Sequence, residues 1–371
     1  MIRHTAARCA IAATALAFAP LSAAAQTVSA GGLLQRYTFA EPDAASVESL
    51  TVIALPFAAR APLGNPRLAL TVNGMWARGT LQDPTRGELS ISGLADTQVA
   101  LTASGRGGAT SVTLIALAPT GNPTQNLDES RVAGAVASEL LPFALSNWGT
   151  GGGFGVSAAT AHRLGTIGVG LSASYLVRQE FEPLADRTFA YRPGDVLRLV
   201  GAIDATVGAA SKAQLQVAWH HHADDSDIDE ANLFRAGDRL QVMGSLGFPV
   251  NRTSTGLVYA ALHHRASGSY LASPETVASR DLLLLGGGLR YRLGSGTVAL
   301  PRVEGRLFRR DDGIEQGWDL GVGLDLEVDV AGTVWVPTVR AHLGDLEVRE
   351  GVSTGFTGFE AGLTLRFGGG A

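Results

Sequence analysis

The chain has 371 residues, of which 17% are charged and 46% are hydrophobic, with 47 glycines and a formal net charge of −5. This composition is too apolar for a disordered chain and too rich in glycine for a helical protein. The negative net charge gives no reason to expect a nucleic acid partner. An all-β chain accounts for these values, either as a barrel with an apolar outside and a polar inside or, less well, as a secreted protein.

The first 25 residues have the three parts of a secretory signal peptide. Arg3 and Arg8 are basic, residues 9–21 are apolar, and three alanines at 23–25 precede Gln26. The apolar run is too short to cross a membrane as a helix, and the small residues suit cleavage. The only cysteine, Cys9, leaves with this segment, so no disulfide or thiolate metal site is expected in the mature chain. We predict export of a single domain over residues 26–371.

Segments in which apolar and polar residues alternate follow along most of the mature chain. Alternation of this kind predicts strands with one apolar and one polar face. Short turns and longer loops alternate between them, as in outer-membrane barrels with an even number of strands. We expect about sixteen strands, or fourteen if residues 26–46 form a periplasmic or lumen-plugging segment. The expected strands are 33–40, 47–60, 67–76, 88–102, 110–118, 154–162, 167–178, 196–208, 214–222, 239–248, 254–265, 281–293, 298–309, 318–329, 335–343 and 359–367.

The strand at 318–329 gives the clearest separation of two faces. One face carries Trp318 and a series of aliphatic residues, and the other carries four acids. A charge that faces lipid at mid-depth costs about 2–4 kcal/mol for arginine or lysine and less for acids, so these acids must face water. Neighbouring strands place basic residues on the same face, where opposite charges can pair. The predicted lining of a water-filled interior is Arg290, Arg292, Arg302, Glu304, Arg306, Asp319, Asp325 and Glu327.

Aromatic residues on the opposite faces are expected to lie at the two membrane–water interfaces. Aromatic residues make up 6% of the chain, so these girdles would be thin. The expected members are Trp76, Tyr175, Trp219, Tyr259, Tyr291, Trp318 and Trp335.

The last strand, 359–367, is amphipathic and ends in an aromatic residue. Its nine residues fit a tilted membrane strand, which needs about 9–11. The segment resembles the C-terminal strand of Gram-negative outer-membrane β-barrels, although residues 368–371 continue past the aromatic residue that usually ends the chain. The resemblance implies a closed antiparallel transmembrane barrel in the cell outer membrane, reached through the periplasm. It also implies that the barrel-assembly machinery reads Phe359, Leu363, Leu365 and Phe367.

Residues 119–149 interrupt the strand pattern. Asn126 and Glu129 have the spacing of a capping box, and Val132, Val136 and Leu140 lie on one face of the helix that would follow. This segment joins the fifth and sixth strands as the third outer loop. Its position resembles that of the third loop of general diffusion porins, which folds into the pore. The resemblance implies a constriction, whereas a surface helix over the barrel mouth is the alternative. The loop residues expected at a constriction are Asp128, Glu129, Arg131 and Glu139.

Three short motifs, at 93–97, 119–121 and 147–151, indicate a second resemblance. They are similar to landmarks of outer-membrane transporters for hydrophobic compounds, namely the fatty-acid transporter group and proteins of aromatic-degradation pathways. This resemblance implies a hydrophobic or aromatic solute. The Asn-Pro-Ala hatch motif of the fatty-acid transporters is not evident after Ala25.

Other chemistry is less well supported. His220, His222 and Asp224 could bind a divalent ion, but they are better explained as polar residues of the lumen or rim. We expect no catalytic residues, metal or cofactor, and a passive channel for small molecules whose partners are lipid, the assembly machinery and the solute. A barrel enzyme that hydrolyses lipid, an autotransporter translocator and a structural or adhesive barrel remain as alternatives, and a homo-oligomer stays open.

Overall fold

The computed structural model describes residues 27–186, 190–208, 210–227, 233–271, 273–312, 316–349 and 351–368. The signal peptide predicted at residues 1–25 lies outside these ranges. In the described part of the chain, no helix combines the length and the apolar character that crossing a membrane requires.

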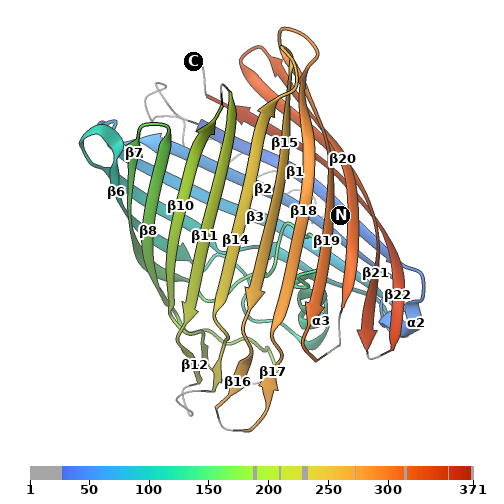
Figure 1. Cartoon of the computed structure of the whole chain (residues 1–371). Helices are drawn as coiled ribbons and strands as arrows, with labels where there is room; N and C mark the ends of the chain where they lie inside the picture. Colours follow the sequence, from blue (N-terminus) through green and yellow to red (C-terminus); the bar gives the residue numbers. More distant parts are fainter. Residues whose placement is uncertain are drawn as a thin grey trace.

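The described chain forms one closed antiparallel β-barrel (Figure 1). Seventeen strand segments belong to its sheet, but β4 and β5 both pair with β3 and share one place, so the wall has sixteen strands. The strands are β1 (Thr27–Phe39), β2 (Ser49–Pro62), β3 (Leu68–Asp83), β4 (Gly87–Leu94), β5 (Thr97–Ser104), β6 (Thr110–Ala118), β7 (Gly153–Leu164), β8 (Ile167–Arg178), β10 (Val196–Val207), β11 (Ser211–His222), β14 (Arg239–Pro249), β15 (Ser254–Arg265), β18 (Arg280–Arg292), β19 (Thr297–Arg310), β20 (Gly317–Val330), β21 (Thr333–Arg349) and β22 (Val352–Phe367).

The first and last strands close the barrel. β1 pairs antiparallel with β22 from Val28 opposite Phe367 to Phe39 opposite Phe356. β1 begins at Thr27, well before the expected start at residue 33. The fourteen-strand alternative was therefore wrong, since the segment it treated as a plug is a full strand of the wall. The expectation of sixteen strands is confirmed.

The two ends of the barrel differ. One end, here called the loop end, carries α2 (Pro42–Ala45), α3 (Leu127–Val136) and a small second sheet (Figure 1). That sheet consists of β9 (Tyr191–Arg192), β12 (Asp224–Asp227), β13 (Phe234–Arg235), β16 (Gly268–Tyr270) and β17 (Thr276–Val277). The opposite end, called the turn end, has short connections such as the 3₁₀ turn η1 (Arg106–Gly108). Arg235 donates to Asp224 at 2.6 Å in the small sheet, and this hydrogen bond holds the pKa of Asp224 below its ordinary value.

Alternate residues face opposite sides of the wall, as the sequence pattern predicts. On β2, Ile53 is 41% exposed on the outside, whereas its neighbours Val52 and Ala54 are fully buried on the inside. On β20, Val322 is 57% exposed while Asp319 is buried. The outside is therefore mainly a belt of exposed apolar side chains, and the inside holds most of the ionisable ones, whereas Arg36 and Arg78 face outward. An apolar belt on a closed barrel supports a location in the outer membrane of a Gram-negative bacterium.

The aromatic girdle differs from expectation at one residue. Tyr259 faces the interior, where its hydroxyl donates to Glu304 Oε2 at 2.6 Å. Its ring occupies the space over Gly286, where any β-carbon would collide with it. Tyr175, Tyr291, Trp318 and Trp335 are exposed on the outside as predicted. The partly buried hydrogen bond to Glu304 stabilises the inward position of Tyr259, and Gly286 of the neighbouring strand leaves room for its ring.

Two adjacent residues of β11 provide a test of which face of the wall points to lipid and which points to the lumen. Val217 is exposed to the outside, and Gln216 lies on the inside opposite Met243. We expect Val217→Arg to lower the free energy of unfolding by about 2–4 kcal/mol, because the charge would face lipid at mid-depth. Gln216→Arg is the matched control and should change the free energy of unfolding by about 0.5 kcal/mol or less, because this side chain faces the water of the lumen. Urea unfolding of the protein in phospholipid vesicles measures both, and equal effects would contradict the assignment of the two faces.

Candidate functional site

The long connection between β6 and β7 folds into the barrel. Asn126 caps α3 by accepting hydrogen bonds from Asp128 N at 3.0 Å and Glu129 N at 2.9 Å. The Glu129 carboxylate accepts from Asn126 N at 3.0 Å, which completes the predicted capping box. The helix ends at Val136, four residues before Leu140, which the sequence placed on the same helical face.

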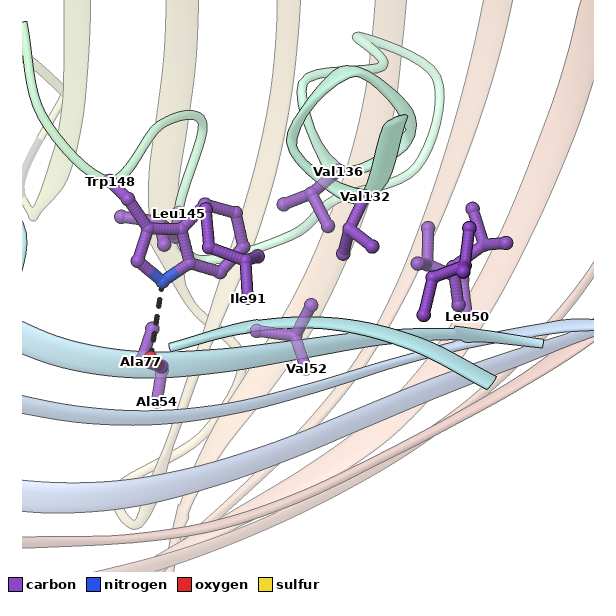
Figure 2. Packing of buried hydrophobic residues seen from close by; sticks show 11 residues of the cluster. Leu50, Val52, Ala54, Ala77, Ile91, Val132, Val136, Leu145 and Trp148 are labelled. Atoms are coloured by element: carbon purple, nitrogen blue, oxygen red, sulfur yellow. Dashed lines mark hydrogen bonds between the residues drawn. The ribbon is translucent and has the colours of Figure 1, made fainter. Parts of the chain in front are cut away.

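Apolar residues fix α3 against the inner face of the wall. Val132 and Val136 are fully buried against inward-facing side chains of three strands (Figure 2). These partners are Leu50 and Val52 of β2, Ala77 and Leu81 of β3, and Leu89 and Ile91 of β4. The inner face of these strands is apolar because the helix covers it. This explains why residues 47–60 have no polar face in the sequence.

Beyond the helix, the loop reaches another part of the wall. Leu140 and Leu141 are buried with Tyr37 and Phe39 of β1, and with Leu282, Phe308 and Phe356 of β18, β19 and β22. Gln35 of β1 clamps the next turn: its amide donates to Pro142 O at 2.8 Å, and its carbonyl accepts from Ala144 N at 2.8 Å. The loop is therefore held at several points of the inner face rather than lying over the mouth.

The loop returns to β3 through Trp148. This ring is fully buried, and its Nε1–H donates to Ala77 O at 3.1 Å (Figure 2). Asn122 N donates to Trp148 O at 2.9 Å, so the two ends of the loop lie side by side. At Gly121 a β-carbon would collide with Trp148 O, which explains the glycine at this close approach.

The three short motifs noted in the sequence meet at the base of this loop. Asp96, at the break between β4 and β5, accepts from Thr150 N at 2.7 Å and Thr150 Oγ1 at 2.9 Å. Its other oxygen accepts from Gly121 N at 3.2 Å. Thr120 Oγ1 donates to Ala95 O at 2.9 Å. The motifs therefore form one hydrogen-bonded junction that ties both ends of the loop to the wall, a contact that the sequence reasoning did not foresee.

The residues expected to line the interior face it, and most of them pair. Arg302 contacts Asp325 at 2.8 Å, Arg306 contacts Glu304 at 2.7 Å, and Arg290 contacts Glu327 at 2.8 Å. Glu327 also lies 3.8 Å from Arg366. These pairs largely neutralise the wall formed by β18–β20.

Two members of that set behave differently. Asp319 is buried and lies 3.1 Å from Nδ1 of His342, a residue that the sequence reasoning missed. Arg292 lies at the turn end of β18 with an exposed side chain. The Asp319–His342 pair could have been found from the sequence only with the register of β20 against β21.

The four charged residues predicted at the constriction lie apart from one another and have different partners. Glu139 reaches the opposite wall, 3.7 Å from Arg280. Asp128 lies 3.9 Å from Arg86 in the β3–β4 turn, Glu129 caps the helix, and Arg131 is exposed. Glu139 is thus the loop acid that meets a basic residue of β18.

The histidine cluster of the sequence is dispersed. His220 and His222 face the lumen, whereas Asp224 is bonded to Arg235 in the small outer sheet. Across the described ranges, no group of three or more histidine, cysteine, aspartate or glutamate residues is placed to hold a metal ion.

A row of basic residues was also missed by the sequence reasoning. Each of six consecutive strands places one basic residue at the same level of the inner face, within two residues of its loop end. The row is Arg198, His220, Arg239, Arg265, Arg280 and Arg310. The sequence alone does not show this row, because the alignment depends on the register of six strands.

Comparisons with known proteins bear on the fold. No family model matches the chain, and no curated protein sequence matches it. Pseudomonas putida OprB is similar in structure, with a TM-score of 0.50 and 12% identity over 92% of this chain and 94% of that one. A mutant of the Rhodopseudomonas blastica porin gives a TM-score of 0.42 and 13% identity over 92% of this chain and 100% of that one. A loop-deletion mutant of Vibrio cholerae OmpT gives a TM-score of 0.42 and 10% identity over 93% of this chain and 100% of that one. The likeness to OprB shows a porin-like barrel fold.

Trp148 offers a test of how the loop is held. We expect Trp148→Ala to weaken docking of the loop by about 3–5 kcal/mol, because it removes a fully buried ring. The barrel should still form, while trypsin should cut the loop at Arg131 faster and single-channel currents should become larger and noisier. Leu127→Ala, at an exposed position of α3, is the control and should behave as wild type. Unchanged cleavage and current in Trp148→Ala would contradict this role.

Proposed function

We propose that the protein is a passive outer-membrane channel for small molecules. The observation that carries the proposal is a closed sixteen-strand wall with a lipid-compatible outside, an ionisable inside and a loop anchored within. Ionised side chains that are only partly buried indicate a wet interior, because charges are costly without water or partners. A wet interior inside a barrel offers a route for polar solutes that needs no energy source.

The inward loop is proposed to set the size of the passage. It packs against β1–β4 on one side and against β18, β19 and β22 on another, so it narrows the cross-section at the loop end. The charged set predicted from the sequence would line the remaining passage. Because most of these residues are paired across or along strands, they are expected to keep the wall hydrated without strong charge selection.

A hydrophobic or aromatic solute is the second candidate. It is favoured by the junction of the three motifs at Asp96, because these motifs are similar to landmarks of transporters for hydrophobic compounds. Under this proposal the solute would contact exposed apolar side chains of the loop, such as Leu127 of α3, during passage.

The end strand is proposed to serve assembly. Phe359, Leu363 and Phe367 are exposed on the outside of β22, and Leu365 shares their face. Export by the signal peptide would deliver the chain to the periplasm, where the assembly machinery would read this face before insertion into lipid.

Removal of the loop tests the channel and its constriction together. Because Asn122 and Trp148 lie side by side, residues 123–147 can be replaced by two glycines without opening the wall. We expect wild-type protein to conduct in planar bilayers and to admit small sugars into liposomes, and the shortened variant to conduct more and admit larger sugars. No conductance and no uptake by either protein would contradict the channel.

Solute choice separates the candidates. Swelling with sugars, amino acids and aromatic acids of graded size should report entry of polar solutes. Uptake restricted to hydrophobic solutes would favour the second candidate. Product formation from a lipid ester by purified protein in detergent would favour a barrel enzyme instead.

A further inference from the structure

The basic row identified above concentrates positive charge on one side of the lumen. Arg198 lies opposite His220, His220 opposite Arg239, and Arg239 opposite Arg265. Arg265 lies opposite Arg280, which lies opposite Arg310. Neighbouring strands are about 4.7–4.9 Å apart, less than the screening length of about 8 Å at physiological salt. The charges of neighbouring arginines in this row therefore act together on an approaching ion.

Only part of this charge is compensated. Glu139 lies 3.7 Å from Arg280, and Asp312 lies 2.6 Å from Arg310. Within the described ranges, the side chains of Arg198, Arg239 and Arg265 make no ion pair or hydrogen bond, and Nε of Arg239 is buried without a partner. Two acids of the adjacent outer sheet are engaged elsewhere, since Asp224 bonds Arg235 and Asp225 bonds Gly194 N. Unpaired arginines at this density attract anions from solution.

The position of the row suits contact with a passing solute. The helix α3 packs on β2–β4, and in a sixteen-strand ring the strand opposite β2 is β14, which carries Arg239. The inward loop and the unpaired arginines thus lie on opposite sides of the lumen, both near the loop end of the barrel. The apolar side chains of α3 are buried against the wall, so a solute that passes the loop meets the guanidinium groups of the facing strands.

We propose that Arg198, Arg239 and Arg265 form a binding subsite for small organic carboxylates and make the channel anion-selective. A guanidinium group presents two parallel N–H donors that match a carboxylate, and its charge is permanent. The rest of the wall does not oppose this preference, because Arg302, Arg306 and Arg290 are already paired with acids. The inference rests on the proposed channel function and adds the class of solute.

Ion selectivity in planar bilayers tests the subsite. We expect the wild type to pass chloride in preference to potassium under a salt gradient, and benzoate to reduce the chloride current in a saturable way. The double variant Arg239→Gln/Arg265→Gln should lose most of the chloride preference and most of the block. Lys212→Gln removes a lumen-facing cation at the turn end and should keep both. A wild-type channel with no anion preference, or a double variant that keeps it, would overturn the proposal.

A conservative variant and a binding assay separate the remaining outcomes. Arg239→Lys/Arg265→Lys keeps the charge but loses the paired donors, so it should retain chloride preference and bind benzoate several-fold more weakly. Calorimetry with benzoate, acetate and inorganic phosphate on the full chain in detergent measures binding without conduction. Benzoate binding by a protein that does not conduct would refute the channel and keep the subsite. Conduction without any benzoate binding would refute the subsite and keep the channel. Tighter binding of phosphate than of either carboxylate would overturn the assigned solute class.

Discussion

Closure of β1 on β22 is the constraint on which the rest of the structure depends. In lipid no water is available to satisfy peptide groups, so a sheet with free edges would leave a row of unpaired donors and acceptors in hydrocarbon. The pairing from Val28 with Phe367 to Phe39 with Phe356 removes both edges at once. Because closure fixes which face points outward, it also decides where each alternate side chain must lie. The apolar belt and the ionisable interior are consequences of that single pairing.

The interior is uneven because the inward loop requires a dry surface. Its apolar residues, Val132, Val136 and Leu140, can be buried only where the wall is apolar too, and β1–β4 together with parts of β18, β19 and β22 supply that surface. The rest of the wall is free to carry charge. Gln35, Trp148 and Asp96 then fix the loop by directional hydrogen bonds, which specify its path more narrowly than apolar packing alone.

Local patterns predicted most of the strands, because alternation depends only on neighbours in the sequence. Alternation was enough to place Val322 outside and Asp325 inside, and the capping box was enough to start α3 at the right residue. The first strand was underestimated because residues 27–32 are small and give little contrast between faces. Tyr259 was misplaced because its inward position depends on Glu304, which lies two strands away.

Features that depend on the register between strands could not be predicted from the sequence. The pairing of His342 with Asp319 and the alignment of six basic residues each require the offset between strands, which turn lengths and bulges set together. In the sequence, Arg239 and Arg265 are 26 positions apart, and nothing local relates them. In the barrel they are lateral neighbours. A charge row of this kind is therefore a property of the closed wall, and it lies across the lumen from the strands that hold α3.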